Sequence, residues 1–125
     1  MNSPQKLLEL ALLAFFKHQL QLKMYHFQTQ SYGAHKASDS YLETFADKLD
    51  KFMEVAQGPF GRLNMQKIKL NFTVVNDSTI QKELDDFIKL LKEWDGTSLN
   101  YAELLNIRDE LVADAEQLKY LLTFK

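Results

Sequence analysis

Four long segments without internal helix breakers constrain the fold of this chain more than any other feature of its sequence. Proline and glycine interrupt helices, and here they cluster at a few points. Pro4 follows Ser3, Gly33 and Gly96 stand alone, and the densest group of breakers lies at 58–61. Between these points, helices are expected at residues 4–28, 34–57, 77–95 and 98–123.

Each segment repeats its apolar residues every three or four positions, which indicates an amphipathic helix. In the second segment these residues are Leu42, Phe45, Leu49, Phe52 and Ala56. The expected helix starts are Ser3 before Pro4 for the first helix, and Asn76, Asp77 or Ser78 for the third, with Gln81 forming a capping box with Ser78. For the fourth helix they are Ser98 or Asn100.

The stretch at 59–76 has a different pattern. Ile68, Leu70, Phe72 and Val74 alternate with polar residues, which indicates an extended segment. A single strand would have no partner, whereas two antiparallel hairpins joined in parallel need a long crossover. A helix of about 23 residues is roughly 35 Å long, and an extended linker of about 18 residues reaches roughly 60 Å. We therefore expect an all-α, four-helix bundle with an extended crossover at about 58–76, its apolar side on the bundle.

The composition excludes several classes of protein. With 46% hydrophobic and 26% charged residues, the 125-residue chain has the make-up of one folded domain, expected to span residues 1–125. The net charge of −2 offers no basic surface for nucleic acid, and no apolar run approaches the roughly 18–20 residues of a membrane span. Because the chain has no cysteine, any metal site would use His, Asp and Glu.

The second segment carries a row of acids on one flank. At about 100° per residue, an arc of about 100° holds one imidazole and four carboxylates. These residues are His35, Asp39, Glu43, Asp50 and Glu54. Two interpretations stay open: a solvated acidic face, or a site for Fe(II), Mn(II) or Zn(II), since carboxylates with imidazole suit these cations.

The positions of two of the three histidines favour the metal site over a solvated acidic face. His26 ends the first segment and stands nine residues before His35, so a short turn would bring the two imidazoles together. Asp39 follows four residues later. His18, two turns before His26, has no matching partner in the sequence, and we expect it on the surface.

The sequence lacks the motifs of other catalytic and binding sites. The sequence has no phosphate-binding glycine loop, no Gly-x-Ser-x-Gly elbow and no His-Glu-x-x-His. The Glu-x-x-His pairs of an internal di-iron centre are also missing, because Phe15, Lys23 and Tyr32 precede the three histidines by three residues.

The residues around the first turn resemble those of the mini-ferritins that protect DNA during starvation, members of the ferritin-like superfamily. In that family a histidine followed by an aromatic residue ends the first helix, and His26 with Phe27 stands at this position. On the second helix of these proteins, a histidine is followed by aspartates at +4 and +15 and by glutamate at +19. Here those steps fall on His35, Asp39, Asp50 and Glu54, and the resemblance covers about residues 20–58.

This resemblance implies a metal-binding protein that oxidises Fe(II), with Mn or Zn as alternative metals. In mini-ferritins the histidines come from one subunit and the acids from its two-fold partner. It therefore implies a homo-oligomer in which His26 and His35 of one chain meet Asp39, Asp50 and Glu54 of another. The extended 59–76 stretch replaces the small helix of the mini-ferritin dimer contact, so a closed iron-storing shell is not implied.

The same region is also similar to a family of short uncharacterised ferritin-like proteins of large DNA viruses and phages. That similarity implies the fold without naming an activity. The alternative function is therefore a structural or interaction module that keeps the bundle without redox activity. The expected location is the cytoplasm, which for a viral protein means the host cytoplasm or the virion.

Overall fold

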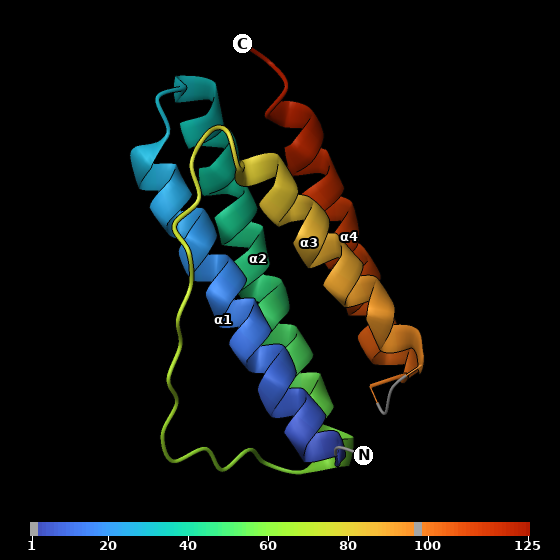
Figure 1. Ribbon diagram of the computed structural model, residues 1–125. Coiled ribbons are helices and arrows are strands. Elements are labelled where there is room, and N and C mark those ends of the chain that lie inside the picture. Colours follow the sequence, from blue (N-terminus) through green and yellow to red (C-terminus); the bar gives the residue numbers. More distant parts are fainter. Residues whose placement is uncertain (1–2, 97–98) are drawn as a thin grey trace.

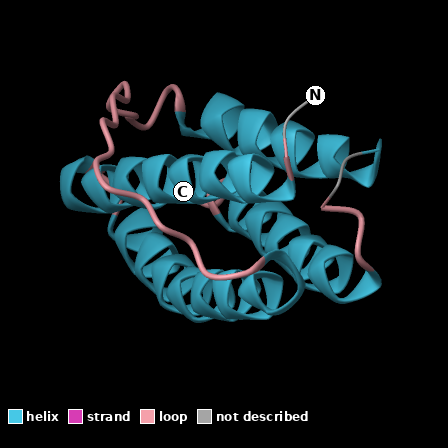
Figure 2. Ribbon diagram, turned by 90° about the horizontal axis from the view of Figure 1, so that it is seen from below, coloured by secondary structure: helices cyan, strands magenta, loops and turns pink. Residues whose placement is uncertain are grey.

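The computed structural model describes residues 3–96 and 99–125, which form four α-helices and, within those ranges, no strand. The helices α1 (Pro4–Gln28) and α2 (Tyr32–Phe60) form one antiparallel hairpin, and α3 (Ile80–Lys92) and α4 (Ala102–Leu121) form the other. A 3₁₀ turn, Glu93–Gly96, extends α3. Helix α2 packs against both α1 and α4, and the view from below shows the helices gathered around one interior (Figure 2). The expected all-α, four-helix bundle is confirmed.

The crossover between α2 and α3 runs the full length of the bundle along the outer side of α1 (Figure 1). The expectation that its apolar side would pack on the bundle is wrong in its register. Ile68 and Val74 are 46% and 45% exposed, and Leu70 and Phe72 are half-buried, whereas Val75 is 4% exposed. A bond from Gln21 Nε2 to the carbonyl oxygen of Thr73 fixes the end of the crossover.

The end of helix α2 differs from the sequence expectation of residue 57. Helix α2 continues past Gly58 and Pro59 to Phe60, and ends at Gly61, whose φ of 85° suits glycine. At this end the Gln57 side chain bonds both to the carbonyl oxygen of Met53 and to the amide of Leu63. These side-chain bonds bridge the last turn, where Pro59 offers no N–H.

The starts of the helices are confirmed only in part. Ser3 caps α1, with its Oγ 3.1 Å from the amide of Lys6. Helix α3 begins at Ile80, and the capping box of Ser78 and Gln81 is wrong because Gln81 Nε2 instead donates to the carbonyl oxygen of Lys119. Helix α4 begins at Ala102 without a side-chain cap, so Asn100 does not have the expected role, and Ser98 lies outside the described residues.

Aromatic side chains fill the middle of the bundle. The fully buried ring of Phe15 makes edge contacts with four rings from α2, α3 and the 3₁₀ turn. Its centroid distances run from 5.2 Å to Phe52 to 6.4 Å to Phe87. This rigid centre fixes where the polar side chains nearby are placed. None of the helices in the described ranges combines the length and apolar character that a membrane span needs.

Candidate metal centre at the first turn

The turn between α1 and α2 is short and is fixed from outside by the crossover. Only residues 29–31 separate the two helices. The Asp77 carboxylate accepts hydrogen bonds from the hydroxyls of Tyr25 (3.0 Å) and Thr29 (2.6 Å) and from the amide of Gln30 (3.1 Å). These bonds lower the pKa of Asp77, with the Thr29 hydroxyl making the largest contribution. The turn therefore holds the end of α1 beside the start of α2.

His26 and His35 lie face to face across this turn. Their ring centroids are 3.9 Å apart and their planes differ by 16°. His26 Nδ1 lies 2.9 Å from the carbonyl oxygen of His35, and His35 Nδ1 lies 3.0 Å from the carbonyl oxygen of His26. The expected approach of the two imidazoles is found, and each residue binds the main chain of the other.

These reciprocal bonds determine the tautomers. A carbonyl oxygen can only accept a hydrogen bond, so each Nδ1 carries its proton and donates. In the neutral rings, each Nε2 then has a lone pair. The His26 ring is buried and also lies 3.1 Å from the Ser38 hydroxyl, which itself donates to the carbonyl oxygen of His35. The arrangement resembles the second-shell bonding that orients a metal-binding histidine.

Asp39 completes what one chain brings to this position. One of its carboxylate oxygens lies 4.0 Å from Nε2 of His26, and the Asp39 side chain is 63% exposed. Two ligands that each lie about 2.0–2.2 Å from one cation can be at most about 4.4 Å apart. A lone pair and a carboxylate oxygen that face each other at this distance therefore fit the two sides of a cation.

The remaining predicted ligands lie elsewhere on the same chain. Asp50 and Glu54 are exposed on α2, eleven and fifteen residues beyond Asp39. At about 1.5 Å per residue, these positions are about 16 and 22 Å further along the helix. Across residues 3–96 and 99–125, no three His, Asp or Glu side chains are grouped so that they could hold a metal ion. The resemblance placed Asp39 on the second chain together with Asp50 and Glu54, whereas in the structure Asp39 lies 4.0 Å from His26 of its own chain. One chain alone thus provides the imidazoles and, beside them, one carboxylate of the predicted site.

The expectation that His18 is a surface residue is wrong. Its side chain is 1% exposed, its ring stacks on Phe87 at 3.7 Å, and Nε2 lies 2.7 Å from the Tyr41 hydroxyl. Nδ1 lies 3.3 Å from a carboxylate oxygen of Glu83. Burial lowers the pKa of His18, and the nearby Glu83 only partly opposes this. The spacing of Ala11, Phe15, His18 and Leu22 at three and four residues was the sequence signal that placed His18 on the core face.

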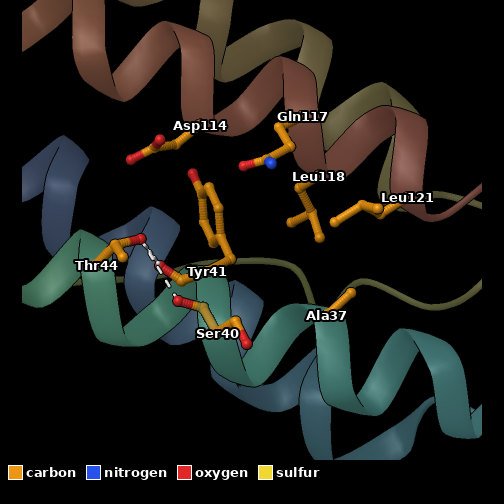
Figure 3. Close-up of a pocket in the computed structure, with 8 residues that line it drawn as sticks. All are labelled: Ala37, Ser40, Tyr41, Thr44, Asp114, Gln117, Leu118 and Leu121. Atoms are coloured by element: carbon orange, nitrogen blue, oxygen red, sulfur yellow. Dashed lines mark hydrogen bonds between the residues drawn. The ribbon is translucent and has the colours of Figure 1, made fainter.

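Tyr41 lies between the pair of His18 and Glu83 and a small hollow that opens between α2 and α4. The hollow has a volume of about 130 Å³, and Figure 3 shows Tyr41 reaching from α2 toward Asp114 on α4. Asp114 is paired with Lys48. Burial, followed by the negative charges of Asp114 and Glu83, raises the pKa of Tyr41 well above its ordinary value. Tyr41 therefore stays a neutral hydroxyl, and Glu83, His18 and Tyr41 form a polar chain across the bundle.

Comparison with known proteins places the chain in a family. Neither the curated proteins nor the solved structures gave a match. Residues 26–122 match a family of unknown function, DUF5856, and this range includes the α1–α2 turn, the acidic flank of α2 and the second hairpin. The chain is a member of this family, the family of unknown function DUF5856.

Proposed function

We propose that this protein is a ferritin-like, metal-binding bundle that binds and oxidises Fe(II) at a site shared between two copies of the chain. His26 and His35 of one copy supply imidazoles, Asp39 lies beside them, and Asp50 and Glu54 come from the other copy. Iron is the substrate, with Mn or Zn as alternative ions. Two Fe(II) ions give two electrons, which together with two protons reduce one peroxide molecule to two waters.

The observation that carries the proposal is the arrangement of the imidazole pair. Because both Nδ1 atoms are occupied by main-chain carbonyl oxygens, the Nε2 lone pairs are left for a ligand. His26 Nε2 faces the Asp39 carboxylate at 4.0 Å. Imidazole nitrogen with carboxylate oxygen is a donor set that suits Fe(II), Mn(II) and Zn(II).

The spacing of the acids on α2 supports a two-fold arrangement. The midpoint between His35 and Glu54 along the helix coincides with the midpoint between Asp39 and Asp50. If a second α2 ran antiparallel about a two-fold axis at this point, His35 would lie opposite Glu54 of the second copy. Asp39 would lie opposite its Asp50. An isologous dimer would therefore contain two identical sites.

The surface beside the imidazole pair also supports a second copy. Phe27 and Tyr32 are 65% and 74% exposed next to the turn, and Leu20 is 43% exposed on α1. A hollow of about 500 Å³ opens between α1 and α2, lined by Leu20, Asp39 and Glu43 among others. Large exposed apolar side chains bordering a hollow are typical of an interaction surface.

Repulsion between carboxylates couples the formation of the dimer to the binding of a metal ion. The antiparallel arrangement places carboxylates opposite carboxylates, and like charges that face each other at short range repel. A cation bound between Asp39 and Asp50 would offset that repulsion. Metal binding is therefore expected to favour the dimer.

The test is Fe(II) oxidation with and without the acids of the second copy. We expect the untagged protein to oxidise Fe(II) faster than buffer does, and Asp50→Asn/Glu54→Gln to abolish both saturable binding and the added rate. The control is Glu103→Gln/Glu110→Gln, which removes two exposed acids from α4. Iron kinetics in the Asp50/Glu54 variant equal to those of the unmodified chain would contradict the proposal.

The alternative function is a structural or interaction module, in a viral or phage particle or in the host cytoplasm. The exposure of Asp50 and Glu54 on a single chain favours this alternative, because an acidic face can also bind a protein partner. A ligand at about 100 times its dissociation constant stabilises the native state by about 2.7 kcal/mol. The alternative therefore predicts that Fe(II), Mn(II) or Zn(II) changes the melting temperature of the unmodified chain no more than that of Asp50→Asn/Glu54→Gln.

A further inference from the structure

A second group of polar side chains lies far from the first turn, in a hollow between α1 and α3. This hollow has a volume of about 120 Å³ and is lined by residues of both helices. We propose that it is a separate cation site, in which His18, Glu83 and Gln21 bind one divalent transition-metal ion of the Zn²⁺ or Co²⁺ type. The ion would tie the first helical hairpin to the second.

The distance between His18 and Glu83 fits two ligands of one ion. Nδ1 and the carboxylate oxygen are 3.3 Å apart, which exceeds the usual N–H···O range of about 2.7–3.2 Å. Two ligands at about 2.0–2.2 Å from a tetrahedral ion lie about 3.3–3.6 Å apart. The pair is thus at ligand spacing before an ion enters.

The His18 ring is already held in the orientation that a ligand needs. Phe87 stacks on its face with planes 5° apart, and Tyr41 bonds to Nε2 at 2.7 Å. With an ion on Nδ1, the neutral ring carries its proton on Nε2 and donates it to the Tyr41 oxygen. Without an ion, the Tyr41 hydroxyl donates to Nε2, so both states of the ring have a hydrogen-bonding partner.

Gln21 supplies an acceptor that nothing else in the described chain uses. The Gln21 side chain is 3% exposed and lines the same hollow, one helical turn beyond His18. Its Nε2 donates to the Thr73 carbonyl oxygen, whereas its buried Oε1 has no hydrogen-bond partner among the described residues. A buried acceptor without a partner destabilises the fold, and an ion in the hollow would bind that oxygen.

The rim of the hollow provides a fourth oxygen and sets the affinity. Asp86 stands one turn beyond Glu83 and lines the hollow, but it is paired at 2.8 Å with Lys82, an 80% exposed side chain. Lys17 also lies at the rim. Removing Lys82 would free Asp86 to bind the ion, so its loss should strengthen binding rather than weaken it.

The experiment is a Co²⁺ titration followed by visible absorption, since ligand-field bands report the coordination of the ion directly. It uses the full chain carrying His26→Gln/His35→Gln, so that the site of the proposed function cannot contribute. We expect one saturable Co²⁺ per chain, displaced by Zn²⁺. Glu83→Gln keeps the side-chain shape and should lower the affinity by roughly 10–100-fold, whereas the exposed control Glu110→Gln should not.

Two further variants separate ligation from a structural role. Gln21→Met should weaken Co²⁺ binding by about tenfold. Because it also removes the bond to Thr73, its control is Asp77→Ala, which loosens the same crossover and leaves the residues of the hollow unchanged. Lys82→Met should tighten binding.

The proposal is overturned if the His26/His35 double variant binds no Co²⁺ saturably, or if Glu83→Gln and Gln21→Met leave the affinity unchanged while circular dichroism shows a folded bundle. Either result leaves the proposed Fe(II) site untouched. Conversely, a finding that the unmodified chain does not oxidise Fe(II) would leave the proposal of this second site intact.

Discussion

His26 and His35 each donate a hydrogen bond from Nδ1 to the main-chain carbonyl oxygen of the other, while their rings stack at 3.9 Å. This reciprocity makes the pair one unit: it closes the α1–α2 turn and directs both free ring nitrogens away from the backbone. A turn of three residues is short enough to enforce this contact.

Replacing His35 should separate the structural role of the imidazole pair from its role in binding Fe(II). His35→Phe keeps an aromatic ring for stacking but removes the donor to the His26 carbonyl oxygen. We expect the free energy of unfolding in urea to fall by about 1 kcal/mol and saturable Fe(II) binding to disappear. Tyr32→Phe, which removes an exposed hydroxyl at the start of α2, is the matched control. Unchanged Fe(II) affinity in His35→Phe would exclude the imidazole pair as ligands.

His18 should make the stability of the bundle depend on pH. Burial lowers its pKa in the folded state below the ordinary value of 6.5, so the folded protein holds a neutral ring. Its contribution is therefore complete above about pH 6.5 and is lost as pH falls below this value, by up to about 1.4 kcal/mol per pH unit. Urea unfolding between pH 7.5 and 5 should show this slope.

The control for this pH dependence is His18→Gln, which lacks the titrating ring. It should be less stable than the unmodified protein at pH 7.5, since the Tyr41 and Glu83 contacts change. Its stability should fall less steeply between pH 6.5 and 5. Parallel curves for the two proteins would show that folding does not lower the pKa of His18.

Asp77 should control how firmly the crossover is held. The Thr29 hydroxyl, then the Gln30 amide, lowers the pKa of Asp77 below its ordinary 3.8, so this contribution is present above about pH 3.8 and is lost as pH falls through the folded pKa. Because Asp77 is largely exposed, we expect Asp77→Ala to cost only about 1 kcal/mol. Hydrogen exchange at pH 6 should show faster exchange in the variant at residues 29–31 and 73–77. Exchange as slow as in the unmodified chain would show that Asp77 does not hold the crossover against the turn.

The helices and the crossover could be predicted because they depend on local signals. Apolar residues at three- and four-residue spacing mark the buried faces, and the reach of an extended chain fixes what the 59–76 stretch can span. The register of the crossover could not be predicted. Alternation identified Ile68 and Val74 as inward-facing, but the crossover is held by the bond from Gln21 to Thr73 and by those that the turn donates to Asp77, and Val75 is buried instead.

In the candidate site, too, features that depend on local sequence could be predicted and features that depend on distant residues could not. The approach of His26 and His35 follows from their places at either end of a short turn. The burial of His18 was missed although its spacing from Phe15 and Leu22 places it on the core face, and its partners, Tyr41 and Glu83, could not be predicted because they are 23 and 65 residues away. Nothing local in the sequence indicates which hydroxyl or carboxylate will meet a histidine on the core face.

The most direct test of the shared site is complementation between two inactive variants. His26→Gln/His35→Gln and Asp50→Asn/Glu54→Gln are purified separately, mixed, unfolded and refolded together, and Fe(II) oxidation is then measured. Each variant alone should be inactive. A mixed dimer pairs an intact imidazole pair with intact acids at one of its two sites, so the mixture should regain about a quarter of the activity of the unmodified protein, since about half of the dimers are mixed. A mixture that stays inactive while light scattering shows mixed dimers would contradict the account.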